Sequence, residues 1–225
     1  MPDGVKIEPR KGKTWKNWLS EGQFYIFGFV YMFARIALNV NATMMPFYLT
    51  TVTGFGEKSE SASETSIPPQ LAIVPLCSYT CSLIWSVWLQ AKLTQKLRNR
   101  LIPMILATFI SIAGSLPFAF LNSNPSIRWL VYPLAGLQGV GIAILLNTGT
   151  SLISDVIGKD SQSAAFVYGI YSLLDKFANG FLLYILVAEY STDENALKWI
   201  MSMVPICAAG GTVIFTWLGM TLYSD

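Results

Sequence analysis

Six long runs of mostly apolar residues dominate this sequence of 225 residues. A helix of about 18 or more apolar residues is long enough to cross the ~30 Å hydrocarbon core of a bilayer. Only helices and closed barrels span that core, and none of these runs alternates as barrel strands do. The sequence therefore predicts an all-α polytopic membrane protein with six transmembrane helices, at about residues 23–49, 71–91, 101–121, 129–153, 164–188 and 197–222.

The composition supports this class and argues against several others. Only 12% of the residues are charged, about half the fraction usual in soluble domains. There is no histidine and there are three cysteines, so we expect no metal site and no cofactor. No nucleophile with an evident base and no glycine-rich phosphate loop occurs, so we do not expect an enzyme. The net charge of +2 gives no indication of nucleic-acid binding.

The basic residues predict the orientation in the membrane. Five lie in an N-terminal segment (residues 1–22), four in the connector 92–100, and one more is Lys159, ten in all on one side. The other side has only Lys58, Arg128 and Lys198. By the positive-inside rule, both termini face the cytoplasm or the matrix-equivalent side of an organelle. We divide the chain into this basic segment (residues 1–22) and a six-helix domain (residues 23–222). Residues 15–19 either lie flat on the membrane surface or belong to a basic tether that fixes the topology.

Two opposite charges are expected near the bilayer midplane. Arg35 lies about halfway along the first apolar run, and Asp175 about halfway along the fifth. An isolated arginine there costs roughly 2.5–3.5 kcal/mol on insertion scales, so such residues are paired or face water. Because the first and fifth runs cross in the same direction, we expect the two side chains at equal depth and turned toward one another. Either they belong to a solute pathway, or they are an internal ion pair that fixes helix packing.

Other polar residues recur at helical spacing and predict polar stripes. Tyr31, Arg35 and Asn39 share a face of the first run; Tyr168, Ser172, Asp175 and Asn179 share one of the fifth, with Lys176 rotated by about 100°. The fourth run adds Gln138, Asn147 and Thr148, whereas the third and sixth carry no internal charge and suit contact with lipid. The candidate solute- or ion-coupling residues are Arg35, Asn39, Asn147, Tyr168, Asp175, Lys176 and Asn179.

Small residues inside the runs have more ordinary interpretations. Gly136, Gly139 and Gly141, and the pair Gly210 and Gly211, are expected to allow close helix contacts. Residues 41–43 (Asn-Ala-Thr) match the glycosylation pattern, but they lie within the first run, which argues against modification.

Two stretches also resemble a known family: "YMFARIALNVNATMMPFYL" and "SLISDVIGKDSQSAAFVYGIYSLLDKFANG". They resemble the seventh span and the tenth-to-eleventh-span region of the major facilitator superfamily. The similarity is to the glycoside–pentoside–hexuronide:cation symporter branch, and closest to the eukaryotic lysosomal/melanosomal cysteine-transporter-like subgroup. The pattern combines Arg35 with Asn39, Asp155 with Gly158, residues 166–169, and Asp175-Lys176 with Asn179-Gly180.

The resemblance implies a fold and a function. The six spans would be helices seven to twelve, a three-plus-three inverted repeat with its site near the midplane. The first, second, fourth and fifth spans would line a cavity for a small polar solute, coupled to a cation or proton. Lys176 lies at the position where relatives in this branch have a lysine in the eleventh helix, and that lysine is tied to the coupling of cation and solute. The compartment implied is a lysosome-related organelle, with the mitochondrial inner membrane as the alternative.

The chain departs from the family pattern in two ways. It has six spans where the family has twelve. Alternating access requires two halves that move relative to one another, and a single half cannot do this. We therefore expect a second half, a homodimer partner or a larger membrane complex, or else the chain is a fragment of a twelve-span protein. The connector "AKLTQKLRNR" also lacks the glycines and aspartate of the family's gating motif. The alternative function is a non-transporting structural or accessory subunit of a membrane complex, built from a degenerate transporter half.

Overall fold

The computed structural model describes residues 14–55, 68–90, 100–158 and 161–223, and within them it is helical. Six helical segments are long and apolar enough to cross a membrane, which confirms the predicted class. They are α2 (Gly22–Thr51), α3 (Gln70–Trp85) with a π-helical turn (Ser86–Gln90), α5 (Leu101–Ser115) with a 3-10 turn (Leu116–Ala119), α7 (Val131–Ile157) preceded by the short α6 (Pro125–Arg128), α8 (Ser161–Tyr190) and α9 (Glu194–Leu222).

The connector predicted between the fourth and fifth spans is largely helical, contrary to expectation. α7 continues to Ile157, and α8 begins at Ser161. Polar residues beyond the hydrocarbon continue the backbone hydrogen bonding of a helix, so the end of an apolar run does not mark the end of the helix. What ends α7 is Gly158, whose φ of +57° is a conformation that favours glycine.

The start of α9 is set by a side-chain cap. Asp193 Oδ1 accepts hydrogen bonds from the backbone N–H groups of Asn195 and Ala196, at 2.9 and 3.2 Å. Such a cap satisfies donors that have no partner within the helix. As a result, α9 begins at Glu194, three residues before the predicted start of the sixth span.

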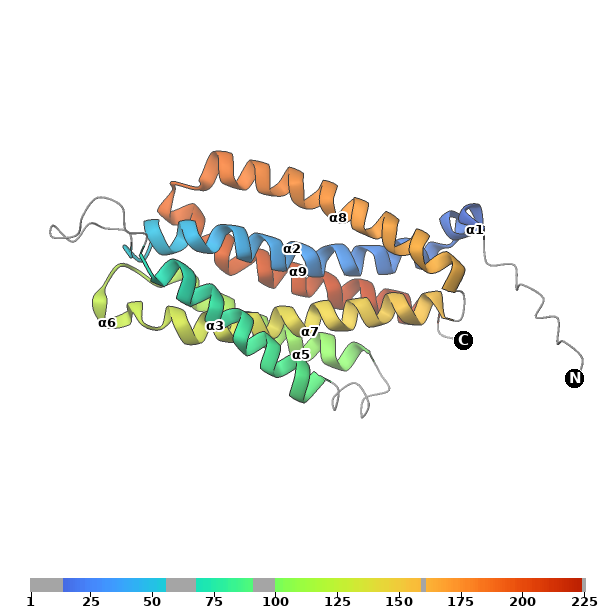
Figure 1. Ribbon diagram of the computed structural model, residues 1–225, viewed down its shortest axis with the longest axis horizontal. Coiled ribbons are helices and arrows are strands. Elements are labelled where there is room, and N and C mark those ends of the chain that lie inside the picture. Colours follow the sequence, from blue (N-terminus) through green and yellow to red (C-terminus); the bar gives the residue numbers. More distant parts are fainter. Residues whose placement is uncertain (1–13, 56–67, 91–99, 159–160, 224–225) are drawn as a thin grey trace, which may run out of the picture.

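The contacts between the helices, which Figure 1 shows as ribbons, follow the pattern of an inverted repeat. α2 packs against α8 and α9, whereas α7 packs against α3 and α5. Exchanging α2 with α7, α3 with α8 and α5 with α9 leaves this pattern unchanged. The central contacts, α2 with α7 and α5 with α9, join the two groups. This is the three-plus-three arrangement expected from the resemblance.

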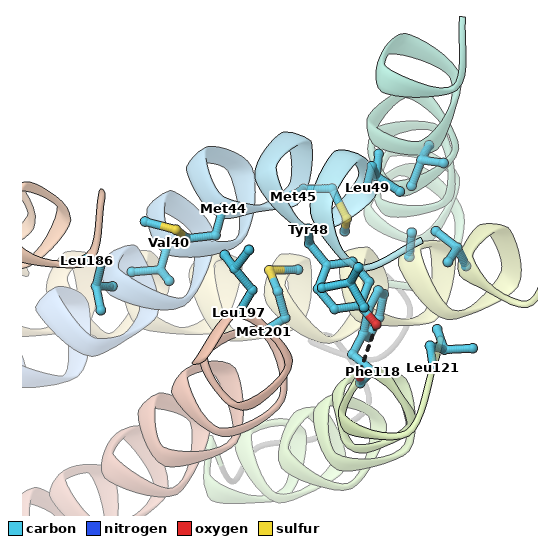
Figure 2. Packing of buried hydrophobic residues seen from close by; sticks show 14 residues of the cluster. Val40, Met44, Met45, Tyr48, Leu49, Phe118, Leu121, Leu186, Leu197 and Met201 are labelled. Carbon is cyan, nitrogen blue, oxygen red and sulfur yellow. Dashed lines mark hydrogen bonds between the residues drawn. The ribbon is translucent and has the colours of Figure 1, made fainter. Parts of the chain in front are cut away.

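A buried cluster closes the bundle at the end opposite the termini (Figure 2). Met44 and Tyr48 of α2 pack there against Phe118 of the 3-10 turn and Met201 of α9, all within 1% of complete burial. The Tyr48 hydroxyl donates a hydrogen bond to the Phe118 backbone carbonyl at 2.7 Å. Phe118 lies in the last turn before the helix ends, where carbonyls lack partners within the helix, so its carbonyl accepts this bond and ties α2 to the end of the third span.

Glycines allow α7 to approach its neighbours closely, as predicted. A Cβ on Gly139 would collide with the Ser78 backbone of α3, and one on Gly141 would lie 2.6 Å from the Ser111 hydroxyl of α5. The expectation for α9 holds only in part. A Cβ on Gly211 would meet Phe33 at 3.1 Å, whereas Gly210 has no neighbour within 4 Å.

The N-terminal region is described from Thr14 onward, and most of the predicted basic segment lies outside the described residues. Residues 15–20 form the short helix α1 (Trp15–Ser20). Its two tryptophans do not both face the membrane, because Trp18 is 1% exposed and packs near Phe24, while Trp15 is exposed. Gly22, at the start of α2, lies against the Tyr223 hydroxyl, so the helical region begins and ends at the same end of the bundle.

Candidate functional site

An ion pair joins α2 to α8 halfway along the bundle. Arg35 Nε lies 3.2 Å from Asp175 Oδ2. Each residue is close to the middle of its 30-residue helix, so both lie near the expected midplane. Asp175 is 1% exposed, whereas the Arg35 side chain is 23% exposed. The structure thus brings together the two charges that the sequence predicted to meet, with the carboxylate inside and the guanidinium partly open.

The other carboxylate oxygen is also engaged. Asn179, one turn further along α8 and itself buried, donates from Nδ2 to Asp175 Oδ1 at 2.6 Å. The same Nδ2 group also lies 2.9 Å from the Asp175 backbone carbonyl. A buried carboxylate that accepts bonds from a cation and an amide is held in one orientation. Asp175 and Asn179, predicted to share a helix face, therefore act as one unit with Arg35, which we call the charged cluster.

Two tyrosines support this cluster on the side toward the termini. The Arg35 guanidinium carbon lies 5.9 Å from the centre of the Tyr31 ring, close enough for a cation–π contact. Tyr31 stacks on Tyr171 with ring centres 6.3 Å apart, and the buried Tyr171 donates its hydroxyl proton to the Phe24 backbone carbonyl. Tyr171 was not among the predicted site residues, although it lies four residues before Asp175 and hence on the same helix face.

Lys176 points away from the charged cluster. It is exposed on α8, as is Ser172, one turn earlier. Large exposed aromatic side chains flank it on the same helix: Phe177, Phe181 and Tyr184 are each more than 70% exposed. α8 therefore presents an ammonium group and a hydroxyl among apolar side chains, halfway along a membrane-spanning helix.

The remaining predicted residues do not join the cluster. Tyr168 lies two turns from Asp175, and its hydroxyl is 2.9 Å from Ser154 Oγ of α7. Asn147 of α7 donates a hydrogen bond to Ser86 Oγ at the start of the π-helical turn. Asn39 is partly exposed and makes no side-chain hydrogen bond within the described residues. Residues of one polar stripe therefore contact different helices. Four-residue spacing shows that side chains share a face of their own helix, but it does not show which helix that face meets.

Gln138 was predicted to line the polar seam, and it does not. Its side chain is fully buried between α7, α5 and α9, where Nε2 donates to Ser115 Oγ at 3.0 Å. Thr148 is buried too, at 2% exposure, but its hydroxyl has no hydrogen-bond partner among the described residues. A polar residue in a membrane helix bonds to another helix as readily as it lines a pathway, and sequence spacing does not separate the two cases.

The helices predicted to face lipid are not the most exposed ones. In the most apolar stretches of α5 and α9, 39% of the residues are buried, against 11% in α3 and 22% in α8. α5 and α9 pack against each other and against the central helices, whereas α3 and α8 flank the bundle with few neighbours. The apolar face of α3 and α8 is therefore left uncovered within the described residues.

A second, exposed ion pair links the helix ends near the termini. Arg100, just before α5, donates from Nε to Asp155 Oδ2 of α7 at 3.1 Å, and from Nη2 to Oδ1 at 3.4 Å. Asp155 is half exposed. Most of the connector that lacks the family's gating motif, residues 91–99, lies outside the described residues. What is described shows that the connector's last arginine is tied to the acidic residue of the Asp155–Gly158 pattern.

The chemistry available at this face is the binding of charge and of hydrogen-bonding groups. No group of three or more metal-ligating side chains occurs among residues 14–55, 68–90, 100–158 and 161–223. The charged cluster offers a buried carboxylate and a partly open guanidinium, and a guanidinium binds anionic and polar groups.

Relatives of this chain carry the name major facilitator superfamily domain-containing protein 12. The human protein is 33% identical over 167 residues, which are 74% of this chain and 31% of the human protein. The mouse protein is 32% identical over the same share of this chain, and the horse protein 31% identical over 173 residues. The chain spans about a third of the length of the curated relatives that it matches.

No model of a known protein family matches the chain, and no solved structure does. The similarity to the three curated proteins, together with six membrane-capable helices, supports membership of the major facilitator superfamily.

Proposed function

We propose that this chain forms one wall of a secondary transporter of the major facilitator type, for a small polar solute coupled to a cation or a proton. A second six-helix half completes the cavity, supplied by a second copy, by another chain or by a further segment of a longer protein. Within the superfamily, we assign the chain to the symporter branch and the cysteine-transporter-like subgroup that its motifs resemble. The integral membrane protein then has both termini on the cytoplasmic side, in a lysosome-related organelle.

The observation that carries this proposal is the exposed Lys176 beside the buried Arg35–Asp175 pair. A lysine at the middle of a membrane helix costs roughly 2.5–3.5 kcal/mol on insertion scales if it faces lipid. The exposed face of α8 is therefore expected to meet water or protein. A cavity between two transporter halves supplies both, and the uncovered apolar side chains of α3 and α8 are the surface that a second half would cover.

The charged cluster suggests how coupling works. When Asp175 is ionised, it holds Arg35; when it takes a proton, the guanidinium is released and can bind an anionic group of the solute. Lys176, on the exposed face of α8 that points away from the charged cluster, supplies a separate cation to the cavity. Asn39, which has no side-chain partner among the described residues, supplies a hydrogen bond to the solute. Tyr168 and Asn147 are engaged with Ser154 and Ser86, and we assign them a supporting role.

Uptake by the assembled protein tests the proposal. We would purify the chain from native membranes with whatever accompanies it, reconstitute it in liposomes, and measure uptake of radiolabelled cysteine and of a radiolabelled methyl glycoside under a proton or sodium gradient. Asp175→Asn and Lys176→Met are expected to reduce uptake at least tenfold. Lys198→Met, which removes a cation bonded to Glu194 and Asn122 near the start of α9, is the control and should leave uptake unchanged.

The outcomes separate the two candidate roles. If both cavity variants transport like the wild type, the charged cluster plays no part in coupling. If the assembly contains a fixed set of other chains and takes up neither probe with any gradient, the chain is an accessory subunit and the transport proposal fails.

A further inference from the structure

A column of aromatic side chains connects the short helix α1 to the charged cluster. The ring of Trp18 in α1 lies 6.3 Å from that of Phe24, at the start of α2, and the Phe24 ring lies 4.9 Å from that of Tyr171 in α8, measured between ring centres. Tyr171 stacks on Tyr31, whose ring contacts the Arg35 guanidinium. The column therefore runs from the end of the bundle near the termini to the ion pair halfway along it.

The column is packed like the interior of a protein. Trp18, Phe24 and Tyr171 are each at most 3% exposed. The Tyr171 ring lies against α2 at Gly28, where a Cβ would come within 3.0 Å of it, and the Tyr171 hydroxyl donates to the Phe24 backbone carbonyl. Close-packed side chains of this kind transmit a displacement, because no empty space absorbs it.

The helix α1 is held to the bundle mainly by one side chain. Of its six residues only Trp18 is buried, whereas Trp15 and Leu19 are 52% and 37% exposed. The backbone is extended at Glu21, so α1 is not continuous with α2. An element with so little buried surface opens more easily than the spans that it covers. Docking of α1 therefore depends on Trp18.

The position of α8 depends on the same column. α8 packs mainly against α2, with smaller contacts to α1 and α7. Asp175 belongs to α8 and Arg35 to α2, so a shift of α8 relative to α2 changes the distance between the two charges. If Trp18 leaves, neighbouring rings move into the space beside Phe24, and they include Tyr171, one turn before Asp175.

We propose that α1 regulates the charged cluster: docking of Trp18 holds α8 where Asp175 pairs with Arg35, and undocking of α1 loosens the pair. By thermodynamic linkage the effect is reciprocal, so breaking the pair loosens α1 by the same factor. The coupling itself does not depend on transport. Its consequence, that α1 regulates uptake of the solute, rests on the proposed function.

Chemical labelling of Arg35 in the intact assembly measures the first direction. Phenylglyoxal, an uncharged reagent for arginine, should modify Arg35 slowly in the wild type and fastest in Asp175→Asn, which leaves the guanidinium without its carboxylate. Mass spectrometry of the Arg35 peptide gives the rates. Trp18→Ala should raise the wild-type rate about fivefold. Trp15→Ala removes the exposed tryptophan of the same helix and should label like the wild type.

Hydrogen exchange of the α1 amides measures the reverse direction, and it tests the proposal even if Trp18→Ala does not fold. Asp175→Asn should speed exchange at residues 15–20 about fivefold. The matched control is Asp155→Asn, which breaks the exposed pair with Arg100 near the same end of the bundle, and it should leave exchange in α1 unchanged.

Two variants of Tyr171 separate coupling through the column from a local loss of packing. Tyr171→Leu interrupts the column, so adding Trp18→Ala to it should leave the labelling rate of Arg35 unchanged. Tyr171→Phe keeps the ring, so adding Trp18→Ala to it should still raise that rate. The comparison of single and double variants isolates the interaction between the two positions.

Three results would each overturn the proposal: equal labelling of Arg35 in Trp18→Ala and the wild type, equal exchange of α1 in Asp175→Asn and the wild type, or faster labelling on addition of Trp18→Ala to Tyr171→Leu. If the expected labelling and exchange are observed but the assembly takes up no solute, the coupling stands and the transport proposal alone fails.

Discussion

Arg35 Nε and Asp175 Oδ2 lie 3.2 Å apart although 140 positions separate the two residues in the chain. This pair joins the first and fifth spans, the two helices that carry the internal charges. Its second carboxylate oxygen is occupied by Asn179. The geometry is that of a buried charge satisfied from both sides, and it makes specific predictions about stability as well as about transport.

Removal of one member of the Arg35–Asp175 pair should lower the free energy of unfolding much more than removal of both. Arg35→Met leaves the Asp175 carboxylate buried without its cation, and we expect a loss of about 3–5 kcal/mol in the free energy of unfolding. Combining Arg35→Met with Asp175→Leu should restore most of the loss, because no charge is then left behind. Equilibrium unfolding in mixed micelles with increasing denaturing detergent measures both values.

The exposed pair at the helix ends is the matched control. Arg100→Met breaks the bond to the half-exposed Asp155 and should cost less than about 1 kcal/mol, since solvent screens both charges. Equal losses for Arg35→Met and Arg100→Met would mean that the midspan pair is as solvated as the exposed one.

The buried hydrogen bond between Tyr48 and the Phe118 carbonyl should stabilise the fold more than the exposed bond between Tyr25 and the Leu19 carbonyl. Tyr48→Phe keeps the ring but leaves a buried carbonyl without its donor, and we expect a loss of about 1–2 kcal/mol. Tyr25→Phe removes a similar bond to the Leu19 carbonyl at an exposed site and should change stability by less than about 0.5 kcal/mol. Parallel unfolding curves of the two variants test this; indistinguishable midpoints would contradict it.

The close contact of α7 with α3 depends on Gly139. Gly139→Ala places a methyl group against the Ser78 backbone, so the helices must separate, and overpacking of this kind costs about 1–3 kcal/mol. Gly149→Ala, on the same helix, meets only Val30 at 3.8 Å and should be neutral or slightly stabilising. The difference in thermal midpoint between the two variants is the measurement, and a Gly139→Ala protein as stable as Gly149→Ala would show that α3 shifts freely.

Water access to the exposed face of α8 can be measured in the intact assembly. In a background with Cys77, Cys81 and Cys207 replaced by alanine, Lys176→Cys should react with a membrane-impermeant, charged thiol reagent, because a cavity between two halves admits water. Phe109→Cys, at a 67% exposed position of α5 that faces lipid in the proposed arrangement, should not react. Labelling of Phe109→Cys but not of Lys176→Cys would place the water on the other face and reject a cavity along α8.

Much of the architecture follows from the sequence alone. Apolar runs longer than the bilayer core leave a helix as the one solution for the backbone, so six spans and the helical class were predictable without coordinates. The position of Arg35 and Asp175 along their runs fixed their depth, and the cost of isolated charges in lipid required a partner. Depth along a helix depends only on residue count, which the sequence contains.

The lateral arrangement was decided by the tertiary structure. Spacing places Gln138 and Asn147 in polar stripes of the same span, yet only packing determines that Gln138 is enclosed near Ser115 while Asn147 reaches Ser86 at the start of the π-helical turn. The importance of Tyr171 depends in the same way on which helix lies opposite, because its contacts are with Phe24 and Tyr31 of α2. Which neighbour a helix face meets depends on contacts between distant segments, and these have no signature in local spacing. The sequence therefore determined what crosses the membrane and at what depth, and the fold determined which side chains meet there.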